Sequence, residues 1–170
     1  VLGTPVYRGS MTGLMKTFLD RLLPRYDPWL VPHPTIEGAT GHPARGPEPR
    51  RFVLVSPCGF PGLHNFDALV HTVRHIARMH SAEVCAEILR PFGEPLRLKA
   101  LQGLFTGYYA DLETAGREIV TAGAISGGTQ QRLHRDLLPG GPAEQWKMAN
   151  DHWSRLRRDS GLTTRSAAGT

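Results

Sequence analysis

The chain has 170 residues, 40% of them hydrophobic, which is enough for one globular domain with its own core, and a second domain is not expected. Lysine and arginine total 20 against 15 aspartate and glutamate, a formal net charge of +5, with much of the excess at Arg155, Arg157, Arg158 and Arg165. The basic residues are not interleaved with aromatic ones, which argues against nucleic-acid binding, and no apolar run approaches the roughly 20 residues that span a bilayer.

The first predicted element is the end of a buried strand, followed by a tight loop and a helix. The apolar residues of the helix recur every three or four positions and predict one buried face: Met11, Leu14, Met15, Phe18, Leu19, Leu22 and Leu23. Ser10 is the expected N-cap, and Pro24 ends the helix. In the loop, Gly9 permits a backbone conformation closed to other residues, and the amides from Val6 to Met11 lack helical partners. Such a loop can hold the polar edge of a ligand.

The span from Arg25 to Arg50 is predicted to be a long loop without regular structure, because six prolines interrupt it: Pro28, Pro32, Pro34, Pro43, Pro47 and Pro49. Long loops inside a domain tend to be functional or mobile. Tyr26, Trp29 and His33 are therefore candidates for covering a ligand or a partner surface. An ordinary surface connection is the alternative.

Residues 51–56 form a short, β-branched apolar run, typical of a strand buried on both faces of a parallel sheet. The loop that follows, Ser56 to Gly62, turns sharply. Ligands of open parallel sheets lie beyond the carboxyl ends of the strands, so this loop and the Thr4–Met11 loop are the expected walls of a site. We interpret Cys58 as a small residue filling the turn rather than a catalytic thiol, since no histidine base is fixed beside it.

Residues 65–80 have apolar positions on one helical face and predict a crossover helix to a strand at residues 82–89. The crossovers are expected to be right-handed. His71 and His75, four residues apart, project away from the apolar face and lack the glutamate of a zinc-protease motif. We therefore expect a solvated pair and no metal site.

The rest of the chain is predicted to be helical over residues 96–109, 110–124, 130–138 and 142–158, with a break at Gly127 and Gly128. The aromatic residues in these helices are expected to be packing residues: Tyr108, Tyr109, Trp146 and Trp153. Residues 1–158 are predicted to form the domain, and residues 159–170 a disordered tail. Cys58 and Cys85 show no disulfide or metal-ligand spacing, and no signal peptide is evident, so we expect a soluble protein of the reducing cytoplasm.

Two sets of motifs resemble one family. Thr-Pro-Val-Tyr-x-Gly-Ser-Met-Thr from Thr4, then Met-Lys-x-Phe-Leu-Asp-Arg from Met15 and a proline, resembles the flavin-contacting loop and helix of the flavodoxin-like NAD(P)H-dependent FMN reductases. Ala115-Gly116-Arg117-Glu118 with Gly123-x-Ile-Ser, and Met148-Ala149-Asn150-x-x-Trp153, resemble the C-terminal segments of the same reductases. The resemblance implies an α/β fold: a flavodoxin-like parallel sheet with helices on both faces, plus C-terminal helices.

The resemblance also implies a cofactor and a set of contacts. FMN would be the cofactor, NAD(P)H the co-substrate, and a quinone, nitro or azo compound the electron acceptor, in a homodimer whose partner subunit helps to wall the flavin site. The residues implied to border the flavin are Thr4, Pro5, Val6, Tyr7, Arg8, Gly9, Ser10, Met11, Pro57, Cys58, Gly59 and Phe60. No catalytic side chain and no metal ligand is implied, because the cofactor carries the chemistry. Arg8 is a candidate for attracting the nicotinamide phosphates or offsetting the charge of a reduced flavin.

The resemblance covers the later half of the family's core and the C-terminal helices. The chain begins at Val1, directly in a strand end, and contains no match to the family's earlier Ser/Thr-rich loop for the FMN phosphate. We therefore expect the core to be N-terminally incomplete. Two alternatives remain: a non-catalytic, truncated flavodoxin-like remnant, and a flavin electron carrier that does not oxidise NAD(P)H.

Overall fold

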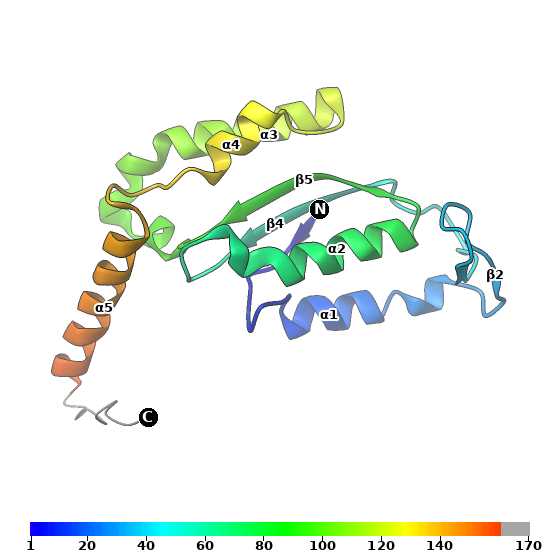
Figure 1. The fold of residues 1–170 in the computed structure, drawn as a ribbon, viewed down its shortest axis with the longest axis horizontal. Helices are drawn as coiled ribbons and strands as arrows, with labels where there is room; N and C mark the ends of the chain where they lie inside the picture. The colour runs from blue at the N-terminus through cyan, green and yellow to red at the C-terminus, as the bar shows by residue number, and fades with distance from the viewer. Residues whose placement is uncertain (161–170) are drawn as a thin grey trace. The chain divides into compact units, whose positions relative to one another are not determined.

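The structure is a computed structural model that describes residues 1–160 (Figure 1). The chain divides into two compact units, residues 1–137 and residues from 138 onward. The helices and strands of the first unit are β1 (Leu2–Gly3), α1 (Gly13–Asp20), β2 (Val31–Pro32), β3 (Thr40–Gly41), β4 (Arg51–Pro57), α2 (Asp67–Met79), β5 (Glu83–Arg90), α3 (Thr106–Ala122) and α4 (Gly127–His134). Short 3₁₀ helices lie at Leu23–Arg25, Leu63–Phe66, Glu94–Arg97 and Lys99–Phe105. The second unit contains α5 (Gly141–Asp159).

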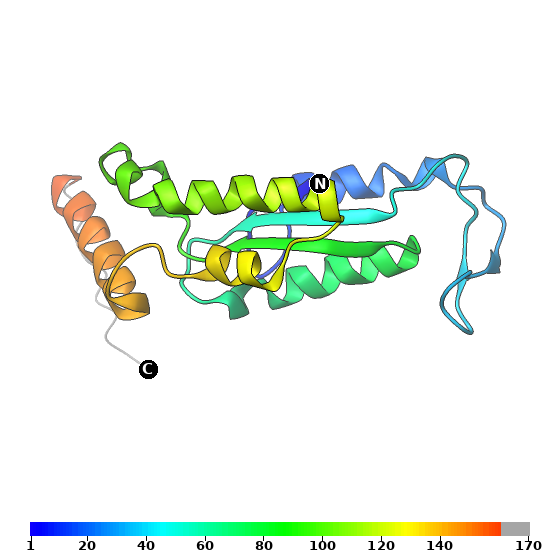
Figure 2. The same cartoon turned by 90° about the horizontal axis from the view of Figure 1, so that it is seen from above.

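The core of the first unit is a parallel sheet of three strands in the order β1-β4-β5. Helices α1 and α2 cover one face of this sheet, and α3 and α4 cover the other, as Figures 1 and 2 show. The predicted fold class is confirmed: an α/β fold with a parallel sheet flanked by helices and C-terminal helices after it, consistent with a flavodoxin-like fold.

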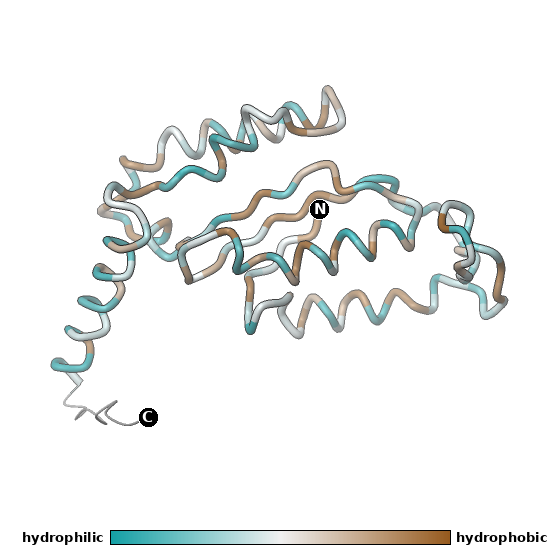
Figure 3. The backbone as a smooth tube through the Cα atoms, viewed as in Figure 1, coloured by the Kyte–Doolittle hydropathy of each residue, from teal (hydrophilic) through white to brown (hydrophobic). Residues whose placement is uncertain are grey.

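Strand β4 lies between β1 and β5, and its side chains are buried on both faces of the sheet, as its apolar run predicts. Phe52 and Leu54 pack into the cluster beneath α1 and α2, whereas Val53 belongs to the cluster beneath α3 and α4. Figure 3 shows this hydrophobic run in brown between the helical layers. The register between β4 and β5 shifts by one residue between Phe52 and Val53, opposite Cys85.

Helix α1 is shorter than predicted. Its N-cap is Thr12, whose hydroxyl accepts a hydrogen bond from the Met15 amide at 3.3 Å, so the prediction of Ser10 as the cap is wrong. Ser10 pairs instead with Tyr7 across a tight turn. The helix ends at Asp20, before Pro24, because the chain there continues into a separate 3₁₀ turn.

The predicted apolar face of α1 is only partly buried. Met15 and Leu19, together with the preceding Met11, pack against the core cluster. Leu14 is 87% exposed and Phe18 is 54% exposed, and no residue of α1 is fully buried. The apolar positions span a wider arc than the contact with the sheet covers, which leaves an apolar stripe on the outer side of the helix.

The proline-rich span is not wholly irregular, which corrects the prediction. Strands β2 and β3 form a short antiparallel hairpin, with Val31 opposite Gly41 and Pro32 opposite Thr40. The pairing tolerates Pro32 because a strand of a two-stranded sheet has a free edge where no amide is needed. The base of the segment is closed by an ion pair between Arg45 and Asp27.

Helix α2 and strand β5 agree with their predictions within about two residues. Leu69, Val73 and Ala77 are buried against the sheet, at the helical spacing that predicted this face. His71 and His75 are exposed, as expected for a solvated pair.

The helices after β5 differ from the prediction in their boundaries. Residues 96–109 and 110–124 are not two helices: 3₁₀ turns lead into the single helix α3. The break lies at Gly123, whose φ of 82° gives the left-handed conformation that commonly ends a helix. Gly127 and Gly128 do not break the chain; they form the first turn of α4, which Ser126 caps by accepting from the Thr129 amide. The prediction placed the helix break at the wrong glycines, because a glycine can either end a helix or lie in its first turn.

Helix α5 confirms the helix predicted over residues 142–158. Tyr108 in α3 is buried, as a packing residue should be, whereas Tyr109 in α3 and Trp146 and Trp153 in α5 are exposed and do not pack in the core. The predicted tail begins inside the described region, because Asp159 belongs to α5 and Ser160 is its C-cap; residues 161–170 lie outside the described residues. Within residues 1–160, no helix combines the length and apolar character needed to cross a membrane.

Candidate functional site

The loops that leave the three parallel strands lie side by side at the carboxyl edge of the sheet. Beyond β1, the Thr4 amide donates to Val55 O at 3.1 Å, and the Val6 amide donates to Pro57 O at 2.9 Å. Beyond β4, the Cys58 amide donates to Arg90 O at 2.9 Å. The structure therefore brings together the two segments predicted as the walls of a site, 4–11 and 57–60.

A tight turn projects from the first of these loops. The amides of Tyr7 and Ser10 each donate to the carbonyl of the other, at 2.9 and 3.2 Å. Arg8 and Gly9, between them, have φ values of 54° and 79°. Two positive φ angles define a type I′ turn, which glycine adopts without the steric cost that a Cβ brings.

Thr4 fixes this loop against the start of α1. Its side chain is buried, and its hydroxyl accepts a hydrogen bond from the Thr12 amide at 3.0 Å. Thr12 in turn caps α1 through the Met15 amide. This chain of two threonines explains how the loop holds its shape next to a helix N-terminus, and Thr12 is a residue that sequence reasoning missed. A threonine just before the helical spacing of Leu14, Met15, Phe18 and Leu19 was its available signal, but Ser10 competed for the same role.

Several backbone amides of the two loops have no acceptor. Among the described residues, the amides of Arg8, Gly9, Met11 and Gly59 donate no hydrogen bond. Unpaired amides on neighbouring strand-exit loops can donate to the carbonyl oxygens and ring nitrogens of a bound heterocycle.

Two aromatic rings stand out from the same loops. The Tyr7 side chain is 65% exposed and Phe60 is 71% exposed, so neither is used for packing in the core. Arg8, Gly9, Pro57 and Gly59 are exposed as well. Cys58 differs: it is buried, and its Sγ accepts from the Phe60 amide at 3.4 Å. That contact agrees with the interpretation of Cys58 as a residue that fills the turn.

Strand β5 contributes a residue that sequence reasoning missed. Arg90 is only 4% exposed although it lies at the carboxyl end of the strand. Its Nη1 donates to Arg135 O at 3.0 Å and its guanidinium lies 5.2 Å from the centre of the Tyr108 ring, whereas its Nε has no partner within the described chain. Burial lowers the pKa of Arg90. An arginine directly after the apolar pair Ile88 and Leu89, at the end of the strand, was the signal that could have pointed to it.

The three candidates from the proline-rich span do not join this edge. Tyr26 and His33 contact the C-terminal end of α2, which leads into the amino end of β5: Tyr26 contacts His80, and His33 contacts Met79. Trp29 is exposed on the same segment. The prediction that these residues cover a ligand held by the strand-exit loops is not supported, because they lie at the opposite end of the strands (Figure 1).

At that opposite end, three titratable side chains meet. Tyr26 Oη donates to Glu48 Oε1 at 2.6 Å, and His80 Nδ1 lies 2.8 Å from the same oxygen. Burial and the hydrogen bond to Glu48 raise the pKa of Tyr26 to about 12. Burial by itself would raise the pKa of Glu48, but the hydrogen bonds from Tyr26 and His80 outweigh it and lower that pKa. Glu48 is therefore ionised at neutral pH.

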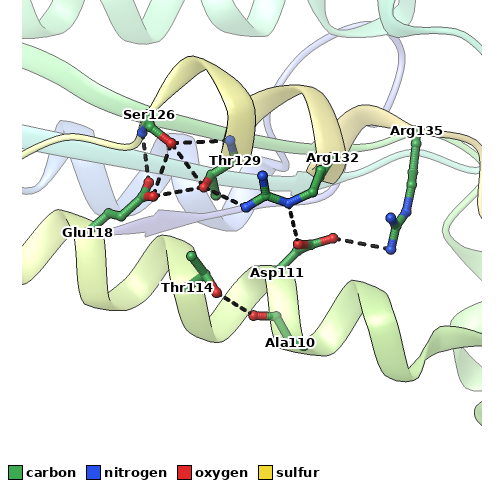
Figure 4. Close-up of polar contacts among 8 residues, drawn as sticks. All are labelled: Ala110, Asp111, Thr114, Glu118, Ser126, Thr129, Arg132 and Arg135. Atoms are coloured by element: carbon green, nitrogen blue, oxygen red, sulfur yellow. Dashed lines mark hydrogen bonds and ion pairs between the residues drawn. The ribbon is translucent and has the colours of Figure 1, made fainter.

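A further polar cluster joins α3 to α4 (Figure 4). The hydroxyl of Thr129, a fully buried residue, donates to Glu118 Oε1 at 2.9 Å and accepts from Arg132 Nη2 at 2.9 Å. Arg132 Nε also donates to Asp111 Oδ1 at 2.7 Å, and Arg135 Nη2 lies 3.2 Å from Asp111 Oδ2. The hydrogen bond from the Ser126 amide is the main reason that the pKa of Glu118 is lowered. Every member takes part in holding α4 on α3, which is a structural role.

Within the described chain, no three His, Cys, Asp or Glu side chains are grouped closely enough to hold a metal ion. Comparison with family models, with curated proteins and with solved structures gave no match.

Proposed function

We propose that this chain is an FMN-dependent NAD(P)H oxidoreductase of the reducing cytoplasm, which passes hydride from the nicotinamide to the flavin and on to a quinone, nitro, azo or similar acceptor. The proposal rests on the loop residues that resemble the FMN reductases. One observation supports it above the others: the hydrogen bond from Val6 N to Pro57 O sets the two implied flavin loops directly beside each other.

The residues of these loops fit an isoalloxazine ring. A flat heterocycle needs apolar or aromatic surface for its faces and hydrogen-bond donors for its carbonyl and nitrogen edge. The exposed rings of Tyr7 and Phe60 supply the first, and the unpaired amides of Gly9, Met11 and Gly59 supply the second. When bound, FMN would supply the two-electron chemistry that no side chain here provides.

The chain's own part is to orient and shield the ring. Arg8 is exposed on the type I′ turn and follows Tyr7 directly in the sequence. Its positive charge would favour the phosphates of the dinucleotide. The Thr4–Thr12 contacts keep the turn fixed relative to α1, which limits the entropy lost when a ligand orders the loop.

The first experiment is a titration of the 170-residue chain with FMN, followed by the absorbance and fluorescence of the flavin. We expect stoichiometric binding near micromolar concentrations, with a shifted or quenched flavin band. Variants Tyr7→Ala and Phe60→Ala should weaken binding, whereas Tyr109→Ala, a partly exposed tyrosine of α3, should not. A folded chain that leaves the flavin spectrum unchanged would contradict the proposal and favour the non-catalytic alternative.

The second experiment separates a reductase from an electron carrier. NADPH or NADH is added to the flavin-loaded chain without oxygen, and the visible absorbance band of the flavin is followed. A reductase bleaches within seconds and recovers when a quinone is added. A carrier binds FMN equally well but stays oxidised with both nicotinamides while dithionite bleaches it.

A further inference from the structure

A cleft of about 510 Å³ lies between the proline-rich segment and the end of α2. Its lining includes Tyr26, His42, Glu48, Met79 and His80. None of the predicted flavin residues lines it. Its volume falls within the roughly 300–1,000 Å³ range of small-molecule sites, and a group of interacting titratable side chains in a cleft is a recognised mark of one.

The hydrogen-bond network assigns the proton of His80. Glu48 is ionised and can only accept, so His80 Nδ1, 2.8 Å from Glu48 Oε1, must carry a hydrogen. The Tyr26 hydroxyl donates its only hydrogen to Glu48, so it has none left to donate to His80. In the tautomer that carries this hydrogen on Nδ1, the other ring nitrogen, Nε2, is an acceptor, and within the described chain no group donates to it.

The other histidines at the cleft, and the second oxygen of Glu48, also have no hydrogen left to donate into it. His42 Nδ1 lies 3.1 Å from the Trp29 carbonyl, so this nitrogen donates and Nε2 is left as an acceptor. His33 is fully used: its Nε2 donates to Met79 O, and its Nδ1 accepts from the amides of Thr35 and Ile36. Glu48 Oε2 accepts no hydrogen bond from any described side chain or backbone amide.

The hydrogens of Tyr26 Oη, His80 Nδ1 and His42 Nδ1 are thus already occupied, whereas the hydroxyls of Thr40 and Ser81, which also line the cleft, can accept as well as donate. Three acceptor atoms remain: Nε2 of His80, Nε2 of His42 and Oε2 of Glu48. A divalent metal is not the matching ligand, since these side chains are not grouped closely enough to coordinate one ion. A larger molecule that carries several N–H donors can span acceptors that are farther apart. The remaining wall, formed by Val31, Pro32, Pro34 and Met79, is apolar.

We propose that this cleft binds a small organic cation with a planar N–H donor group, of the amidinium or guanidinium type, on an apolar body. The carboxylate of Glu48 offsets its charge, and the imidazoles of His80 and His42 accept its remaining hydrogens. A planar donor fork matches the geometry of a carboxylate, as arginine does in proteins. The site is independent of flavin binding and lies at the other end of the sheet.

Benzamidine is the probe that tests this, added to the full chain labelled with ¹³C at its methionine methyl groups. The chain has four methionines, and of these only Met79 lines the cleft. We expect a saturable shift of the Met79 resonance with a Kd of about 1 mM or lower, as suits a ligand of this size. Met11, Met15 and Met148 serve as internal controls and should not move.

Two comparisons decide the outcome. Benzoate, which has the same ring but only acceptors, should leave Met79 unchanged in the wild-type chain. Glu48→Gln should weaken benzamidine binding at least tenfold, while Glu37→Gln, which removes an exposed charge elsewhere in the segment, should not. Absence of a saturable Met79 shift, equal binding of benzoate, or full affinity in a folded Glu48→Gln variant would overturn the proposal.

Discussion

Single residues set the geometry of the strand-exit loops, and Gly9 is the clearest case. Its φ of 79° lies in the left-handed region, where a Cβ costs about 1 kcal/mol. We predict that Gly9→Ala lowers the free energy of unfolding by about that amount, measured by urea denaturation. Gly13→Ala is the matched control: Gly13 starts α1, its Cβ would meet no atom within 4 Å, and alanine favours helices, so stability should stay equal or rise. Equal losses in both variants would contradict the turn assignment.

Arg8 extends the same turn into solvent. If its charge attracts the phosphates of the nicotinamide nucleotide, Arg8→Ala should raise the apparent KM for NADPH a few-fold, because exposed ion pairs contribute about 0.2–1 kcal/mol. The flavin content of the chain should not change. Arg21→Ala, at the C-cap of α1, removes the same charge elsewhere and should leave KM unaltered. An unaltered KM in Arg8→Ala would show that Arg8 does not attract the phosphates of the nicotinamide nucleotide.

The raised pKa of Tyr26 should make the stability of the chain depend on pH in the alkaline range. Its pKa is raised from 10.0 to about 12 in the folded chain, so the folded state holds the phenolic proton more tightly than the unfolded state does. This contribution to stability is fully present below pH 10 and is lost as the pH rises toward 12. Wild type should therefore lose stability over this window more steeply than Tyr26→Phe, in urea titrations at each pH. Tyr7→Phe, at an exposed tyrosine, should follow the wild-type slope.

At the scale of elements, the contact between α3 and α4 depends on one buried hydroxyl. Thr129→Val keeps the shape of the side chain but leaves Glu118 and Arg132 without their shared partner. We expect a loss of about 1–3 kcal/mol in the free energy of unfolding. Thr121→Val, an exposed threonine on α3, should change it by no more than about 0.5 kcal/mol. If the two variants were equally stable, the cluster would not hold α4 in place.

The helices also show how far periodicity predicts burial. The spacing of α2 predicted its buried face, and Leu69, Val73 and Ala77 confirm it. The same reasoning was wrong for half of α1, where Leu14 and Phe18 are exposed. Periodicity identifies which residues share a side of a helix, but the width of the contact depends on what the sheet presents to it.

For the whole molecule, the proposed cofactor should act through mass action on the folded state. FMN at 100 times its Kd should stabilise the chain by about 2.7 kcal/mol, because the unfolded chain has no site. Riboflavin should bind almost as well, since the loops offer neutral amides and aromatic rings rather than a phosphate site. Thermal unfolding with each flavin measures both effects. A much weaker effect of riboflavin would mean that residues outside these loops bind the phosphate.

The sequence by itself determined the α/β class, the buried central strand, the crossover helix and the two loops at the strand ends. These features follow from local patterns: β-branched runs, helical spacing, and glycine or proline between them. That the two loops meet follows from the general rule that parallel strands end at one edge, and the hydrogen bond from Val6 to Pro57 confirms it. Their contact with a flavin stays a prediction.

Only the tertiary structure decided which polar groups meet. Glu48 contacts Tyr26, 22 residues before it, and His80, 32 residues after it. Arg90 is buried against α3, a helix that begins 16 residues later in the chain. It also decided that Thr12 and not Ser10 caps α1, because Ser10 is held in the turn with Tyr7. Spacing along the chain carries no information about contacts that form when separate elements pack, so local patterns predict elements while packing determines sites.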